Sequence, residues 1–357
     1  MEPISHEDHA SHQAKTTTHK EENQIIKNLT PPVQKSWEWI KRLTRLEMVG
    51  LVAIFILIAT LLFDFNFSVR RKTWVNALLG RTSTAQSAPA DNTQDRQAKS
   101  QDLEIDPALA AAVLPVEGVI LPVNWGDLGK QMMKAGVIDQ KKFEDLYAQR
   151  GGLDPEMKKM LLEDGNGKIK VTQSNSQTIL NLLWGLGLGN KNEILEKGEM
   201  QNPQYGGAAN FASTGGWSLA SGKTMDHYSK HAFIKLTAVQ QALVDKVSQG
   251  IYRPCCGNST HFPDCNHGMA MLGLLELMAA QDVSEQDMYK AALAINSFWF
   301  PDTYLTIAKY LKTQGQDWNS TPPQVLLGAQ YSSGPGYKQI LSQVSPVAPK
   351  GNGGCGV

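Results

Sequence analysis

The densest group of chemically reactive side chains lies between Cys255 and His267. These thirteen residues hold three of the four cysteines and two of the eight histidines: Cys255, Cys256, His261, Cys265 and His267. Thiolates and imidazoles are the ligands by which proteins bind zinc, copper(I) and iron. The spacing, CC-x4-H-x3-C-x-H, matches no established zinc-finger pattern. The density of these residues, and not their order, therefore predicts a metal site.

Pro254 and Gly257 predict a turn around the two adjacent cysteines. Adjacent side chains usually point apart, so one ion is expected to take only one of Cys255 and Cys256. The expected ligand set combines one of these thiolates with two further residues of the same stretch and one more histidine: Cys265, His267, and either His261 or His231.

Two weaker candidate ligands lie outside the stretch. His231 follows His227 by four residues, so the two would share one face of a helix, although a solvated helix face is the simpler interpretation. Cys355 lies in the Pro- and Gly-rich end of the chain, residues 345–357. It could bind the same ion or pair with an odd cysteine, and a free terminal thiol is the alternative.

Two other interpretations of the cysteines stay open. A helix expected over 268–280 begins just after Cys265, with Asp264 as its N-cap, and the positive end of the helix dipole lowers a thiol pKa there. Cys265 could then be the catalytic nucleophile of a thiol enzyme, or act in thiol–disulfide exchange. Alternatively, disulfides staple a loop of a non-catalytic binding module.

The domain that positions this stretch is expected to be mostly α-helical. Residues 268–280 hold one charge, Glu276, and are apolar on all sides, so this helix should be central and buried. Only two short strands are expected, over 113–123 and 168–172. Apolar periodicity and N-cap residues predict further helices over six ranges: 139–147, 154–162, 175–188, 237–247, 284–298 and 302–311.

An uncharged run of sixteen residues, Met48 to Phe63, predicts a membrane anchor. A bilayer span needs about 20 apolar residues, and Phe65 and Phe67 extend the run toward that length. We expect a single-pass transmembrane helix over about 48–67, with the lipid bilayer as its partner. Basic residues flank both sides equally, and the Ser/Thr/Gln-rich stretch that follows favours an extracytoplasmic C-terminal domain.

The composition divides the chain into five expected parts. These are a disordered polar tail (1–32), a juxtamembrane and transmembrane segment (33–67), an amphipathic segment with a flexible linker (68–104), a helical globular domain (105–344) and a Gly/Pro-rich tail (345–357).

Lys and Arg together number 34, as do Asp and Glu, so the formal net charge is zero. A neutral chain argues against a nucleic-acid-binding protein.

These features predict a membrane-anchored protein whose helical domain binds zinc, copper or iron through cysteine and histidine. Metal handling or redox sensing would follow from such a site. The alternatives are a thiol enzyme that uses Cys265 and a binding module with a stapled loop. The sequence does not identify a protein partner.

Overall fold

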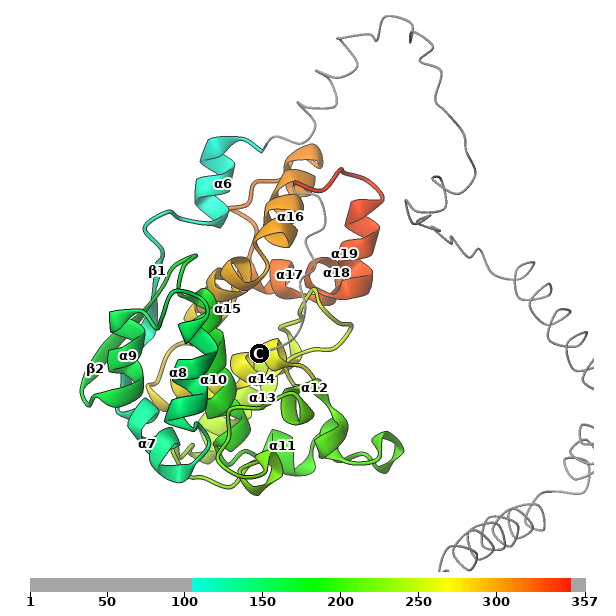
Figure 1. Cartoon of the computed structure of the whole chain (residues 1–357). Coiled ribbons are helices and arrows are strands. Elements are labelled where there is room, and N and C mark those ends of the chain that lie inside the picture. Colours follow the sequence, from blue (N-terminus) through cyan, green and yellow to red (C-terminus); the bar gives the residue numbers. More distant parts are fainter. Residues whose placement is uncertain (1–104, 348–357) are drawn as a thin grey trace, which may run out of the picture. The chain divides into compact units, whose positions relative to one another are not determined.

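The computed structural model describes residues 105–347. This part of the chain is mostly helical and has two short strands, as expected (Figure 1). The elements that position the site are, in chain order, α6 (Pro107–Val113), β1 (Val119–Gly126), α7 (Leu128–Ala135), α8 (Gln140–Ala148), α9 (Pro155–Leu162), β2 (Asn166–Val171), α10 (Ser176–Gly189), α11 (Glu193–Lys197), α12 (Ala212–Gly215), α13 (Ala238–Gln249), α14 (Asn266–Ala280), α15 (Glu285–Trp299), α16 (Pro301–Thr313), α17 (Pro323–Leu327), α18 (Ala329–Ser332) and α19 (Gly334–Leu341).

The two strands pair antiparallel, with Val119 opposite Val171 and Gly126 opposite Asn166. The expected strand over 113–123 begins too early, because α6 occupies 107–113 with Asp106 as its N-cap and Pro107 in its first turn. The side chain of Gln281 accepts a hydrogen bond from the Asn124 amide and donates one to the Asn124 carbonyl. This pair of bonds fixes β1 to the C-terminal end of α14.

Several helix starts follow the expected N-cap chemistry. The side chains of four residues accept hydrogen bonds from the first turn of the helix that follows: Asp139, Asp154, Thr237 and Ser284. Thr237 forms a full capping box with Gln240, which satisfies two backbone donors that a helix start leaves unpaired. The starts of α8, α9, α13 and α15 are therefore set by local sequence.

The apolar helix α14 is the centre of the described part, and it is buried along almost its whole length, as expected. α10 packs against it antiparallel, with glycines where the two backbones meet. A Cβ atom on Gly187 would lie 2.0 Å from the Met269 carbonyl oxygen, and one on Gly273 would lie 2.6 Å from that of Leu183. Only glycine permits this approach, which sets the position of the N-terminal end of α14.

The one charged residue of α14, Glu276, is fully buried in a polar network. Its two carboxyl oxygens accept hydrogen bonds from the side-chain amides of Asn190 and Asn192. Burial raises the pKa of Glu276 well above its ordinary value, and the two amide donors oppose this only in part. The network ties the chain after α10 to the middle of α14.

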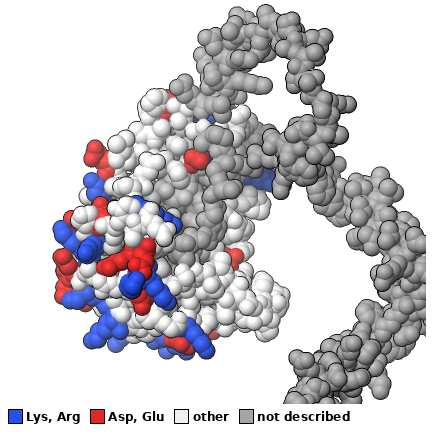
Figure 2. Space-filling model, viewed as in Figure 1, with Lys and Arg blue, Asp and Glu red and all other residues white. Residues whose placement is uncertain are grey.

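Charged side chains of both signs are interspersed over the region of α7, α8, α9 and β2 (Figure 2). Several of them form exposed ion pairs within this region: Lys130–Asp164, Lys141–Asp145 and Lys159–Glu156. Exposed pairs of this kind contribute about 0–1 kcal/mol each. These pairs therefore contribute little to the stability of the described part.

Within residues 105–347, no helix has both the length and the apolar character needed to cross a bilayer. The anchor expected over 48–67 lies outside the described residues, as do the polar tail, the juxtamembrane segment and the linker.

Candidate metal centre

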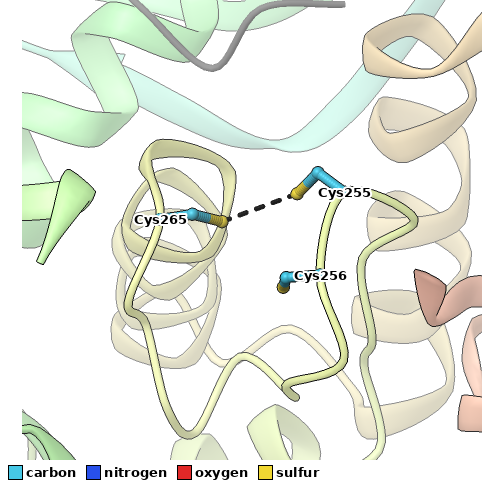
Figure 3. Close-up of side chains that lie close together, drawn as sticks. All are labelled: Cys255, Cys256 and Cys265. Atoms are coloured by element: carbon cyan, nitrogen blue, oxygen red, sulfur yellow. Dashed lines mark hydrogen bonds between the residues drawn. The ribbon is translucent and has the colours of Figure 1, made fainter. Parts of the chain in front are cut away.

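Three cysteines bring their sulfur atoms together at the N-terminal end of α14 (Figure 3). The Sγ atoms of Cys255, Cys256 and Cys265 all lie within 4.8 Å of one another, and those of Cys255 and Cys265 are 3.6 Å apart. None of the three forms a disulfide, so the disulfide staple is not found among the described cysteines. Within residues 105–347, no histidine, aspartate or glutamate joins this sulfur group.

Cys255 and Cys256 lie in a turn, as Pro254 and Gly257 predict. The Cys256 amide donates to the Arg253 carbonyl, and the Cys256 carbonyl accepts from the Gly334 amide at the start of α19. The expectation that only one of these cysteines faces the site is wrong. Side chains alternate in an extended strand, whereas this turn lets both adjacent thiols approach Cys265.

Cys265 is the N-cap of α14, a position that was expected for Asp264. The Asp264 carboxylate instead accepts hydrogen bonds from Arg253 Nη2 at 2.7 Å and from Asn258 Nδ2 at 2.8 Å. The Cys265 side chain makes no capping hydrogen bond, and its sulfur faces the other two thiols. Burial is graded across the group: Cys265 is buried, Cys256 is half-buried and Cys255 is exposed.

The pKa of the Cys265 thiol is held well below its ordinary value. Hydrogen bonds from Cys255 and Cys256 are the largest cause, and the Arg253 charge and a hydrogen bond from His267 add to them against the effect of burial. This is the expected direction, and its largest causes are the hydrogen bonds with the two neighbouring thiols. Cys265 is therefore the first thiolate of the group.

The pKa of Cys256 shifts the other way. Its hydrogen bond with Cys255 lowers the pKa, but the bond with Cys265 and the burial of the thiol outweigh it and raise the pKa above its ordinary value. The three thiols thus share protons around one anionic sulfur, that of Cys265.

Arg253 is the residue of this site that sequence reasoning missed. Its side chain is fully buried, and its Nη2 donates to the carbonyl of Phe262 as well as to Asp264. Burial lowers the pKa of Arg253, but the negative charges of Cys265, Cys256 and Asp264 raise it above its ordinary value, so the guanidinium stays charged.

Two nitrogen donors of the Arg253 guanidinium form no hydrogen bond with the described residues. Among the described residues, no acceptor pairs with Arg253 Nε or Nη1. The group lies against Gly268 in the first turn of α14, where a Cβ atom would come within 2.7 Å of Arg253 Cζ. A buried cation with unpaired N–H groups therefore lies at the same helix end as the three sulfurs.

Of the two histidines of the stretch, His261 stands apart from the sulfur group and His267 borders it. His261 Nε2 lies 2.8 Å from Asp245 Oδ1, so that ring is held by a carboxylate of α13. The buried His267 ring packs against Phe300, with ring centroids 4.4 Å apart. His267 forms a hydrogen bond with Cys265, so its ring borders the sulfur group.

His231 also lies outside the sulfur group. The segment that holds it with His227 is a turn and not a helix, so the solvated helix face is wrong as well. The two rings stack, with His227 Nδ1 3.1 Å from His231 Nε2. Burial and the neighbouring His227 lower the pKa of His231. Cys355 lies outside the described residues.

Comparison with known protein families, with curated proteins and with solved structures found no match for this chain. The site combines three thiol sulfurs within ligand distance of one another, one buried cation, and a histidine, His267, that forms a hydrogen bond with Cys265.

Proposed function

We propose that this protein binds a soft or borderline metal ion, of the class of zinc, copper(I) or iron, through Cys255, Cys256 and Cys265. The observation that carries the proposal is the convergence of three sulfurs, none of them in a disulfide, within 4.8 Å of one another. Tetrahedral zinc with Zn–S bonds of about 2.3 Å places its sulfurs about 3.8 Å apart. The 3.6 Å between Cys255 and Cys265 is close to that edge, so small side-chain adjustments suffice.

The surroundings of the sulfurs support an anionic metal–thiolate complex. Three thiolates around a divalent ion carry one net negative charge, which is costly to bury without a counter-charge. The buried guanidinium of Arg253 supplies that charge at the same end of α14. Its unpaired Nε and Nη1 groups are suited to donate to thiolate sulfur.

The wider role that we propose is metal handling or redox sensing by a membrane-anchored protein. The uncharged run Met48 to Phe63 supports a single-pass anchor in a lipid bilayer, and the stretch after it supports an extracytoplasmic domain. The zero net charge supports the absence of a nucleic-acid partner.

A second candidate function is thiol–disulfide exchange, and the short Cys255–Cys265 separation favours it. The Cys265 thiolate would attack a substrate disulfide, and Cys255 would then release the substrate as two thiols. The products would be a Cys255–Cys265 disulfide and the reduced substrate, so electrons and protons balance. The distance between the Sγ atoms of Cys255 and Cys265 would have to shorten from 3.6 Å to about 2.05 Å, the length of a disulfide bond.

Titration of the reduced full chain with Co²⁺ separates these functions. We expect thiolate-to-cobalt charge-transfer absorption that saturates at about one ion per chain and is lost in Cys265→Ser. His261→Ala is the matched control, because His261 belongs to the same stretch but binds Asp245. Absence of charge-transfer absorption in wild type, together with a Cys255–Cys265 disulfide after reaction with a model disulfide, would favour the second candidate.

A further inference from the structure

The imidazole of His267 lies beside the sulfur group. His267 follows Cys265 by two residues and belongs to the first turn of α14. Side chains of a helix are tilted toward its N-terminal end, so this ring is directed back toward the N-cap residue, Cys265. The ring forms a hydrogen bond with the Cys265 side chain. A nitrogen of a type that binds metal ions therefore borders one of the three sulfurs.

The His267 ring is buried and held by aromatic neighbours. Its residue is only 8% exposed. The ring centroid lies 4.4 Å from that of Phe300 and 5.8 Å from that of Trp299, where α15 ends. A ring that packing already confines has little side-chain freedom left to lose when it binds an ion.

The separation of the ring from Cys265 suits a shared ion. In a tetrahedral site with Zn–S bonds of about 2.3 Å and Zn–N bonds of about 2.0 Å, the sulfur and the nitrogen lie about 3.5 Å apart. A ring nitrogen and a sulfur that form a hydrogen bond are at a similar separation. The ring is not part of the group within 4.8 Å, so the sulfurs of the Cys255–Cys256 turn have to approach it. Cys255 is exposed, which leaves room for this movement.

We infer that His267 supplies the fourth ligand, a neutral imidazole, to the ion held by Cys255, Cys256 and Cys265. This inference rests on the proposed metal site and makes it a closed centre of three cysteines and one histidine, a ligand set of structural zinc sites. The ring nitrogen that faces Cys265 binds the ion through its lone pair, and the ring carries its proton on the other nitrogen. Tetrahedral coordination by sulfur and nitrogen favours Zn²⁺ within the proposed class of ions.

The charge of the site fits an imidazole as the fourth ligand. Three thiolates around a divalent ion carry one net negative charge, and a neutral ring adds none. A carboxylate in the same position would add a second negative charge to a site in which burial makes charge costly. The buried guanidinium of Arg253, whose Nε and Nη1 have no acceptor among the described residues, can balance the single charge.

The test is zinc X-ray absorption spectroscopy of the reduced, zinc-loaded full chain in detergent. We expect wild type to show three sulfurs at about 2.3 Å and one nitrogen at about 2.0–2.1 Å, with the outer-shell scattering of an imidazole ring. His267→Gln keeps an N–H group that can donate to Cys265 but has no imidazole. We expect it to lose the imidazole scattering and to bind zinc about tenfold or more weakly in a chelator competition. His261→Ala is the matched control and should behave as wild type, because His261 binds Asp245.

The outcomes separate this inference from the metal site beneath it. A wild-type spectrum with three sulfurs and no imidazole scattering would overturn the fourth ligand and leave the three-cysteine site standing. His267→Gln that binds zinc as tightly as wild type would do the same, since a hydrogen-bond donor would then suffice. Wild type that binds no zinc would overturn the metal site itself. His267→Cys should restore tight binding and add a fourth sulfur, which separates loss of a ligand from loss of the fold.

Discussion

Saturation with Zn²⁺ should raise the melting temperature of the described part of the chain by about 8–16 °C. Free metal at 1,000 times Kd stabilises a protein by about 4 kcal/mol, and each kcal/mol shifts a domain of 150–250 residues by about 2–4 °C. The physical reason is that the ion joins the Cys255–Cys256 turn to the start of α14. Its binding free energy therefore adds to the folding free energy.

Cys265→Ser should abolish this zinc-dependent shift, because Cys265 is the ligand fixed by the central helix. Thermal melts of the full chain in detergent, with Zn²⁺, with chelator and with reductant, measure the effect. His231→Ala is the control, since His231 stacks on His227 away from the sulfurs. Melts that respond to reductant but not to Zn²⁺ or chelator would contradict the metal site.

Arg253→Met should lower the free energy of unfolding by about 3–5 kcal/mol, the usual cost of removing one partner of a buried ion pair. The substitution leaves the Asp264 carboxylate without its cation and the Phe262 carbonyl without a donor. Arg253→Lys should lose less stability, because lysine keeps the positive charge beside Asp264. It should still lose some, because an ammonium group cannot reproduce the planar set of N–H donors of the guanidinium. Denaturant unfolding of the chelated protein measures both variants.

The control for this series is Arg150→Met, at an exposed arginine. A change there should stay within about 0.5 kcal/mol. If Arg253→Met unfolds with the same midpoint as Arg150→Met, then Arg253 does not hold the turn and the charge argument for the site fails.

Local sequence signals were sufficient for much of the fold. Asp139, Asp154, Thr237 and Ser284 cap their helices as predicted because capping depends on a few neighbouring residues. The central position of α14 was also predictable, since a helix that is apolar on all sides has no face for solvent. The strand β1 was misplaced at its start because the α6 cap at Asp106 competes with the extended pattern.

The ligand set was harder to predict because it depends on contacts between distant parts of the chain. The adjacent cysteines both face the site because the Gly334 amide binds the Cys256 carbonyl, a contact across nearly eighty residues of sequence. Asp264 forms an ion pair with Arg253 and does not cap α14. Nothing in the local sequence pattern indicates that Arg253 is buried. The positions of the histidines also depend on distant residues: Asp245 binds His261, and the ring of Phe300 packs on His267, which forms a hydrogen bond with Cys265.

The central claim is that Cys255, Cys256 and Cys265 bind a metal ion, and the metal content of the loaded protein tests it most directly. Reduced full-length protein is incubated with excess Zn²⁺, separated from free metal by gel filtration and analysed for zinc and protein. We predict about one zinc per chain for wild type and for His261→Ala, and none retained by Cys265→Ser. Wild type that retains no zinc, or Cys265→Ser that retains as much as wild type, would contradict the claim.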